Sequence, residues 1–310
     1  MGSVVDQSTS GHTTQAMRCR GASIDAIVEC VWPARAILGE GCCWDPRSGR
    51  IFWVDIKGRQ LYALSISSGD RQVWTLPCRI GSLAVPPPDW RPPGELAGEL
   101  FLACGDLGLM WLALRATGVR ILVIANPEAH LPENRFNDGK IGPDARYWAG
   151  TMHDLEIHAS GSLYAISSNG SVILLDTGYR VPNGPAFSPD GRTVYHTDSP
   201  LQTVYAFDLS LDGQIGNKRV FVQFEAGEGY PDGMTTDANG YLWIAIWDGA
   251  RIEKVSPEGE RVGHIRMPTP RVTSCSFVGE DVNVIYTTSA SMGVSDVDEA
   301  AGGLFKLILL

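Results

Sequence analysis

Three oxygen-bearing side chains in this sequence share one local setting. Glu40, Asn183 and Asp232 lie far apart in the chain, yet each stands directly before a glycine. Two carboxylates and one amide carbonyl, without sulfur or imidazole, form a donor set that suits Mg²⁺, Ca²⁺ or Mn²⁺. Open coordination positions would also admit Zn²⁺ or Fe²⁺. A fold that brought these side chains together would therefore bind one divalent cation.

An internal repeat supplies the elements that could bring them together. Six short runs rich in aromatic and β-branched residues recur along the chain, with markers at Trp53, Phe101, Trp148, Tyr195, Trp243 and Tyr286. The steps between these markers are 48, 47, 47, 48 and 43 residues. A second apolar series follows the first, with markers at Leu61, Met110, Leu163, Val204, Ile252 and Leu304. The sequence therefore contains six units of similar length.

Each unit has the pattern of strands joined by tight turns. Apolar runs of 4 to 8 residues alternate with Gly, Pro, Asn and Asp, and helical periodicity is scarce. Repeats of about 40 to 50 residues that hold about four strands are typical of propeller blades. We therefore predict an all-β fold, a six-bladed β-propeller, as a single domain over residues 23–310 after a disordered N-terminal tail over 1–22. We expect a strand over 24–32 to pair with the last blade, and the proline-rich segment 86–98 to form a surface loop.

The register of the repeat links the three candidate ligands, because equivalent positions of the blades converge around a central channel. Glu40, Asn183 and Asp232 stand 13, 12 and 11 residues before the aromatic marker of their own unit, and the third unit offers Asn137 or Asp138 there. The glycine that follows would allow close backbone approach. Asp-Gly and Asn-Gly are also common turn dipeptides, but equivalent turns would repeat one residue type. The spacing therefore indicates a metal site, with turn chemistry as the alternative.

Composition argues against several other classes of protein. A hydrophobic content of 44% predicts a globular core, and no apolar stretch reaches the roughly 18 residues that span a bilayer. The formal net charge of -10 opposes binding to nucleic acid or to an anionic membrane. Seven cysteines without a C-x-x-C pair read as reduced core residues of a cytoplasmic protein. The defining motifs of serine esterases, P-loop NTPases and dinucleotide-binding enzymes are missing.

Four sequence strings resemble those of the gluconolactonase and regucalcin (senescence marker protein) family of sugar lactonases. They are LGEGCCW, NRFNDGKIGPDARYWAGTM, VPNGPAFSPDGRTVYHTDS and YPDGMTTDANGYLWIA, and they span almost the whole chain after residue 24 in the family's order. The GTMHD and YHTD strings are similar to those of bacterial pentonolactonases such as xylonolactonase. The resemblance implies a six-bladed propeller that binds one divalent cation and opens aldonolactones.

The resemblance also implies roles for particular residues. The metal ligands fall on Glu40, Asn183 and Asp232, which the register selects independently, and the R-x-N-D-G string places substrate binding at Arg135 and Asn137. The implied reaction is metal-dependent hydrolysis of a pentono- or hexonolactone to the aldonic acid in sugar catabolism. Asp232 would act as the general base.

Other points stay open at the level of sequence. Some relatives place an acidic residue shortly after G-T-M, where this chain has Leu155 and then Glu156, and His153 either touches substrate hydroxyls or stabilises a loop. Two alternatives to the lactonase are a calcium-dependent arylesterase-like propeller, which would prefer aromatic or lipophilic esters, and a noncatalytic metal-binding scaffold. The sequence specifies neither the native metal, nor the lactone, nor the oligomeric state, and a monomer is compatible with it.

Overall fold

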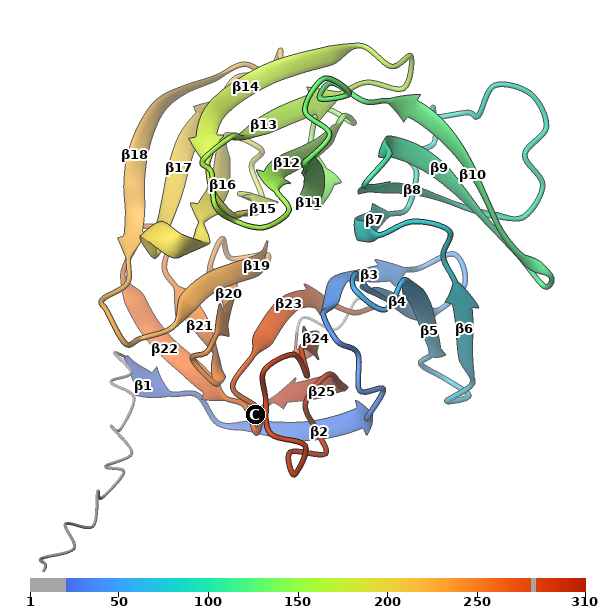
Figure 1. Ribbon diagram of the computed structural model, residues 1–310. Coiled ribbons are helices and arrows are strands. Elements are labelled where there is room, and N and C mark those ends of the chain that lie inside the picture. The colour runs from blue at the N-terminus through green and yellow to red at the C-terminus, as the bar shows by residue number, and fades with distance from the viewer. Residues whose placement is uncertain (1–20, 280–282) are drawn as a thin grey trace, which may run out of the picture.

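The computed structural model of the protein describes residues 21–279 and 283–310. Its strands form six sheets that are arranged radially around a common centre (Figure 1). Five sheets have four strands, and one has five. The predicted all-β, six-bladed β-propeller is therefore confirmed. The described residues contain no helix that is long and apolar enough to span a membrane.

We number the six sheets as blades in chain order, and the strands of each blade are given from the centre outward. Blades 1 to 3 are formed by β3 (Gly39–Asp45), β4 (Arg50–Asp55), β5 (Gln60–Ser65) and β6 (Arg71–Thr75); by β7 (Ile80–Ala84), β8 (Glu99–Gly105), β9 (Gly108–Arg115) and β10 (Gly118–Ala125); and by β11 (Asn134–Ile141), β12 (Tyr147–His153), β13 (Gly161–Ile166) and β14 (Val172–Tyr179).

Blades 4 to 6 repeat this order. They are formed by β15 (Pro182–Phe187), β16 (Thr193–Asp198), β17 (Thr203–Leu209) and β18 (Ile215–Gln223), with the 3-10 helix η1 (Ser199–Leu201) after β16; by β19 (Tyr230–Thr236), β20 (Leu242–Trp247), β21 (Arg251–Val255), β22 (Arg261–Arg266) and β1 (Ala22–Ser23); and by β23 (Val272–Phe277), β24 (Val284–Ser289), β25 (Leu304–Leu309) and β2 (Ala26–Trp32).

The two N-terminal strands join the beginning of the chain to its end. β2 pairs with β25 in antiparallel orientation, as predicted for the closing strand, and β1 pairs with β22 in parallel (Figure 1). β1 and β2 are thereby the outermost strands of blades 5 and 6, and each pairs with the edge of a strand from late in the chain. Residues 1–20 of the expected tail lie outside the described residues. Ala22 was also expected in that tail, but it belongs to β1 and pairs with Gly263 of β22.

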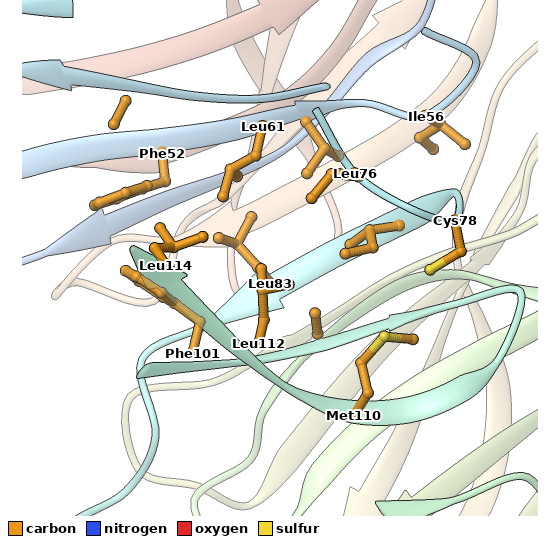
Figure 2. Close-up of a cluster of buried hydrophobic side chains, with 14 residues drawn as sticks. Phe52, Ile56, Leu61, Leu76, Cys78, Leu83, Phe101, Met110, Leu112 and Leu114 are labelled. Atoms are coloured by element: carbon orange, nitrogen blue, oxygen red, sulfur yellow. The ribbon is translucent and has the colours of Figure 1, made fainter. Parts of the chain in front are cut away.

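The hydrophobic core lies between neighbouring blades. In the cluster between blades 1 and 2, Phe52 and Leu61 of blade 1 pack with Phe101 and Leu112 of blade 2 (Figure 2). Each of the other five interfaces between blades holds a cluster of the same kind within the described chain. The aromatic markers of the repeat are all buried. Because apolar burial takes place between the blades, the centre of the ring is left to polar residues.

The proline-rich segment 86–98 joins β7 to β8, as expected from the sequence. Its Trp90 is buried against the cluster between blades 2 and 3, and the indole Nε1 donates a hydrogen bond of 2.8 Å to the carbonyl oxygen of Ala145. The insertion is therefore attached to blade 3 as well as to blade 2, which contains it.

The pairing of each innermost strand with its neighbour is interrupted at a similar position. The strands β3, β7, β11, β15, β19 and β23 contact one another in a closed ring around the centre (Figure 1). In β3 the pairing register shifts between Glu40 and Cys43, and in β15 it shifts between Asn183 and Ala186. The other four strands have a similar shift. A β-bulge changes the direction of the side chains around it, so the repeat directs the candidate ligands toward the channel.

Glycine is required at these bulges for two different reasons. Gly184 has a φ of 85°, in the left-handed region that other residues rarely adopt. At Gly81 a Cβ atom would lie 1.8 Å from the carbonyl oxygen of Asn137 in the next blade. The close backbone approach expected from the sequence is therefore observed.

Candidate active site

One pocket of about 500 Å³ opens at one end of the channel. Its walls come from the starts of innermost strands, the segments that precede them, and the segments that follow the second strands of the blades. Glu40, Arg135, Asn137, Asn183 and Asp232 all line it. The structure thus brings together all five site residues predicted from the sequence. The volume is suited to one small ligand.

The two acidic candidates in this pocket are buried and lack a basic partner. Glu40 is 7% exposed and Asp232 is 6% exposed, and no Lys, Arg or His of the described chain forms an ion pair with either. Each accepts one hydrogen bond from the next backbone N–H, at 3.3 Å from Gly41 and 3.0 Å from Gly233. Burial raises the pKa of both carboxyl groups well above the ordinary value, and for Glu40 the nearby Asp232 adds to this.

Asp138 is a third buried carboxyl group near this pair. It accepts hydrogen bonds from the backbone N–H of Gly139 at 2.7 Å and from that of Gly184 in the next blade at 2.9 Å. Burial raises the pKa of Asp138 to about 6, and its charge contributes to the raised pKa of Glu40 and of Asp232. Three acidic side chains therefore share one region of negative potential, which a divalent cation would compensate.

Aspartates at the ends of second strands fix the segments that enter the site. Asp55, the last residue of β4, accepts hydrogen bonds from the backbone N–H of Ile37 at 2.8 Å and of Leu38 at 3.0 Å. Asp198, the last residue of β16, accepts one from Val181 at 3.2 Å. These bonds hold the chain two residues before Glu40 and before Asn183, so the backbone of both candidate ligands is anchored within its own blade.

Arg135 is held in place by several bonds. Its Nε donates to Asp154 Oδ1 at 2.9 Å, and its Nη1 donates to Asn137 Oδ1 at 3.0 Å and to the carbonyl oxygen of Phe136 at 3.1 Å. The other terminal nitrogen, Nη2, has no partner among the residues that the structure describes. The guanidinium group is therefore oriented by the protein and keeps one nitrogen for a ligand.

Asn137 lines the pocket, but its amide nitrogen is bonded within the protein. Its Nδ2 donates to the carbonyl oxygen of Pro182 at 2.9 Å and to Asn183 Oδ1 at 3.0 Å. Both amide hydrogens are thus used within the protein, and in this arrangement Asn137 can accept a hydrogen bond from a ligand but not donate one.

The conformation of the loop after β12 shows which of its residues face the pocket. His153 is buried, with Nε2 3.3 Å from Glu133 Oε2 and Nδ1 accepting the N–H of Leu155 at 3.1 Å, and it does not line the pocket. Glu156 does line it, whereas Leu155 is 70% exposed elsewhere. The structure therefore favours the loop-stabilising interpretation of His153, and it places Glu156, rather than Leu155, at the site.

Three of the pocket residues that were not singled out from the sequence as part of a site lie at comparable places in their blades. Asp154 accepts hydrogen bonds from both Arg135 and Arg79, and Ser199 accepts one from Asn183. The centre of the Trp247 ring lies 4.6 Å from the guanidinium carbon of Arg271. Their only shared signal in the sequence is a position at or just after the end of a second strand. That signal becomes visible once the ends of the strands are known.

Comparison with known proteins assigns the chain to a family. The family model described as SMP-30/Gluconolactonase/LRE-like region matches residues 38–291. Regucalcin from Gallus gallus is 35% identical over 292 residues, which cover 90% of this chain and 93% of that protein. A 6-deoxy-6-sulfogluconolactonase from Pseudomonas putida is 32% identical over 274 residues, which cover 86% and 88% of the two chains.

A solved structure agrees with these relatives. The calcium-binding protein regucalcin from Agrobacterium tumefaciens superposes with a TM-score of 0.82 at 28% identity, covering 94% of this chain and 96% of that one. The match of the family model extends over most of the chain and includes every site residue described above. This chain therefore belongs to the SMP-30/gluconolactonase/LRE-like family of sugar lactonases and regucalcins.

Proposed function

We propose that this protein hydrolyses a sugar aldonolactone, a pentono- or hexonolactone, with one divalent cation held by Glu40, Asn183 and Asp232. The observation that carries the proposal is the meeting of two buried carboxyl groups without a basic partner and an amide in one pocket. The named lactonase among the relatives supports lactone hydrolysis, and the calcium-binding regucalcin structure supports a cation.

The chemistry of the donor set fits such a cation. The side chains offer carboxylate and amide oxygens, which are the ligands of hard divalent ions. The described residues include no cluster of three or more His, Cys, Asp or Glu side chains that could hold a metal. The proposed site therefore depends on the amide oxygen of Asn183 as its third protein ligand.

The cation, when bound, would polarise the lactone carbonyl and stabilise the negative charge that develops on its oxygen. Asp232 keeps Oδ2 free of protein hydrogen bonds within the described chain, so this oxygen can accept a proton from the attacking water. The proton then passes to the ring oxygen as the carbon–oxygen bond of the ring breaks. The free Nη2 of Arg135 donates to substrate oxygens, and Asn137 orients Arg135 and Asn183.

Removal of divalent cations tests the proposal directly. We expect that protein stripped with a chelator does not hydrolyse lactones, and that adding one of Ca²⁺, Mg²⁺, Mn²⁺, Zn²⁺ or Fe²⁺ restores activity. A cation at a hundredfold excess over its dissociation constant adds about 2.7 kcal/mol to the free energy of unfolding, so the melting temperature should rise as well. Full lactone hydrolysis by protein shown to be metal-free would contradict the proposal.

A substrate panel separates the lactonase from the two alternatives. Ten of the eighteen residues that line the pocket are charged or carry an amide, Glu156 among them, and these groups would bind the hydroxyls of a polyol lactone better than a lipophilic ester. Sugar lactones should therefore be turned over faster than phenyl acetate in a pH-stat assay. The opposite order would support an arylesterase-like hydrolase, and no turnover of either class would support a noncatalytic scaffold.

Replacement of Arg135 by lysine tests the substrate-binding role. Lysine keeps the charge but loses the planar fork that bonds Asp154 and Asn137 together. We expect kcat/KM to fall about 10- to 100-fold, equivalent to roughly 1.4 to 2.7 kcal/mol, mainly through a higher KM. Arg192→Lys is the matched control, because Arg192 is an exposed arginine that does not line the pocket, and it should leave KM unchanged. An unchanged KM for Arg135→Lys would remove this role.

A further inference from the structure

A chain of hydrogen bonds follows one wall of the pocket through four blades. Arg79 of blade 2 donates to Asp154 of blade 3 at 2.7 Å, and Arg135 links Asp154 to Asn137. From there the chain continues through blade 4 to blade 5. Its second half begins at Asn137 and ends beside the proposed catalytic base.

In the second half, a single serine connects the asparagine ligand to the next blade. Asn183 Nδ2 lies 2.9 Å from Ser199 Oγ, and Ser199 Oγ lies 2.6 Å from the carbonyl oxygen of Pro231. Pro231 directly precedes Asp232. Ser199 is buried and lines the pocket, and its own N–H donates to the carbonyl oxygen of Val181 at 3.0 Å. Ser199 is thus fixed at both its backbone and its hydroxyl group.

The donors and acceptors of these hydrogen bonds determine which way the Asn183 amide points. The oxygen and nitrogen of an amide have nearly the same shape, so the hydrogen-bond partners decide the orientation. The carbonyl oxygen of Pro231 can only accept, so the hydroxyl of Ser199 gives its one hydrogen to it. Ser199 Oγ can then only accept from Asn183, and the nitrogen of that amide must face it. The oxygen of Asn183 therefore faces the opposite way.

The other end of the chain requires the same orientation independently. Arg135 is a donor only, so Oδ1 of Asn137 must face it. The Nδ2 of Asn137 then faces Asn183, which has to present its oxygen at 3.0 Å. A carbonyl oxygen has two lone pairs, so Asn183 Oδ1 can serve Asn137 and still bind a cation.

We propose that Ser199 is a positioning residue, which fixes the amide of Asn183 so that its oxygen is presented to the cation. This inference rests on the proposed function, because it assumes a cation at Asn183. Without the hydroxyl group, the amide nitrogen of Asn183 loses its acceptor, and only the bond from Asn137 then holds the side chain, so its oxygen is presented to the cation less firmly. Asn183 would then be a poorer ligand, although nothing in the ligand set itself had changed.

The test compares Ser199→Ala with Ser199→Thr in full-length protein stripped of metal. Titration calorimetry with Mn²⁺ and with Ca²⁺ gives the dissociation constant of the cation without reference to activity. Residues that hold metal ligands in place typically contribute 10- to 100-fold to metal affinity, so we expect Ser199→Ala to weaken binding by about that factor. Ser199→Thr keeps the hydroxyl group and should restore affinity to within about threefold of the wild type.

Two controls separate positioning from general damage. Ser256→Ala removes another buried serine hydroxyl, which accepts two backbone N–H bonds in a turn of blade 5 outside the pocket, and it should leave cation affinity unchanged. In an Asn183→Ala background, Ser199→Ala should cause no further loss, because there is then no amide to orient.

Each outcome of these titrations has one meaning. Wild-type affinity in Ser199→Ala, or a loss of affinity that threonine does not rescue, would overturn the inference while leaving the proposed function intact. A further loss caused by Ser199→Ala in the Asn183→Ala background would also overturn it. A wild-type protein that binds neither cation would instead overturn the proposed metal site.

Discussion

Replacing Asp232 by asparagine is expected to lower kcat for lactone hydrolysis by about 10³-fold, within the roughly 10²- to 10⁴-fold that general-base catalysis contributes. Asparagine has nearly the same shape and can still accept the N–H bond from Gly233 through Oδ1. It can neither take a proton from water at neutral pH nor offer a negative charge to a cation. A pH-stat assay with a sugar lactone measures the loss, and circular dichroism follows the fold.

The fold should survive this change because the native carboxylate is itself unfavourable where it lies. Burial raises the pKa of Asp232, which means that its charged form is destabilised in the metal-free protein, and a neutral amide avoids that cost. Asp190→Asn is the matched control, since Asp190 is also an aspartate before a glycine but lies exposed in a turn of blade 4. It should keep full activity. Retention of more than about a tenth of the activity by Asp232→Asn would exclude Asp232 as the base.

The number of blades and the position of the ligand candidates follow from one regularity of the sequence. Each blade must bury both faces against its neighbours, so aromatic and β-branched runs return once per blade. The polar residues before glycine could be found because every innermost strand enters the channel through a similar bulge. A repeat of this kind places distant residues together without any knowledge of pairwise contacts.

The register could be derived only to within one residue. Tyr195 pairs with the residue three positions after Asn183, whereas the residue three positions after Glu40 pairs with Phe52 and not with Trp53. Counted from Phe52, Glu40 lies 12 residues before its marker, as Asn183 does before Tyr195. Successive side chains of a strand face opposite sides, and two adjacent aromatic residues do not reveal which of them faces the next blade.

The residues that support the ligands could not be predicted in the same way. Asp138 reaches Gly184 of the next blade, and Ser199 reaches Pro231 of the next, so their roles depend on contacts between blades. A single serine after a strand has no distinctive spacing, and Asp138 was open only as an alternative to Asn137. Equivalent positions of the blades can be aligned in the sequence. Such an alignment does not show which side chains touch across two neighbouring blades.

A buried ion network in blade 5 was likewise not apparent from the sequence, and it leads to a large expected effect on stability. Glu253 is fully buried and accepts a bond from Arg251 Nε at 2.7 Å, and bonds from Arg261 Nε and Nη2, both at 3.1 Å. Glu253→Gln would leave two buried guanidinium groups without this charge. We expect the free energy of unfolding to fall by about 3 to 5 kcal/mol, measured by denaturant titration.

The same network also holds the segment that leads to Asp232. Arg261 Nη1 lies 2.9 Å from Glu228 Oε2, and Glu228 is two residues before Tyr230, where β19 begins. Glu253→Gln should therefore have a larger effect on the temperature at which activity is lost than on the kcat measured at low temperature. Glu258→Gln, an exposed change in the same blade, is the matched control and should stay within about 0.5 kcal/mol.

A triple replacement distinguishes the penalty of broken pairing from the net value of the ion network. Arg251→Met, Glu253→Leu and Arg261→Met together remove three of the four charges, leaving Glu228, and fill similar volume. Replacing a buried ion cluster by apolar residues is often neutral or stabilising by about 1 to 4 kcal/mol. The triple variant should therefore be more stable than Glu253→Gln, unless Glu228, left without Arg261, becomes the new unpaired charge. Adding Glu228→Gln to the triple variant separates these two effects. A Glu253→Gln variant as stable as the wild type would show that the two arginines do not depend on Glu253.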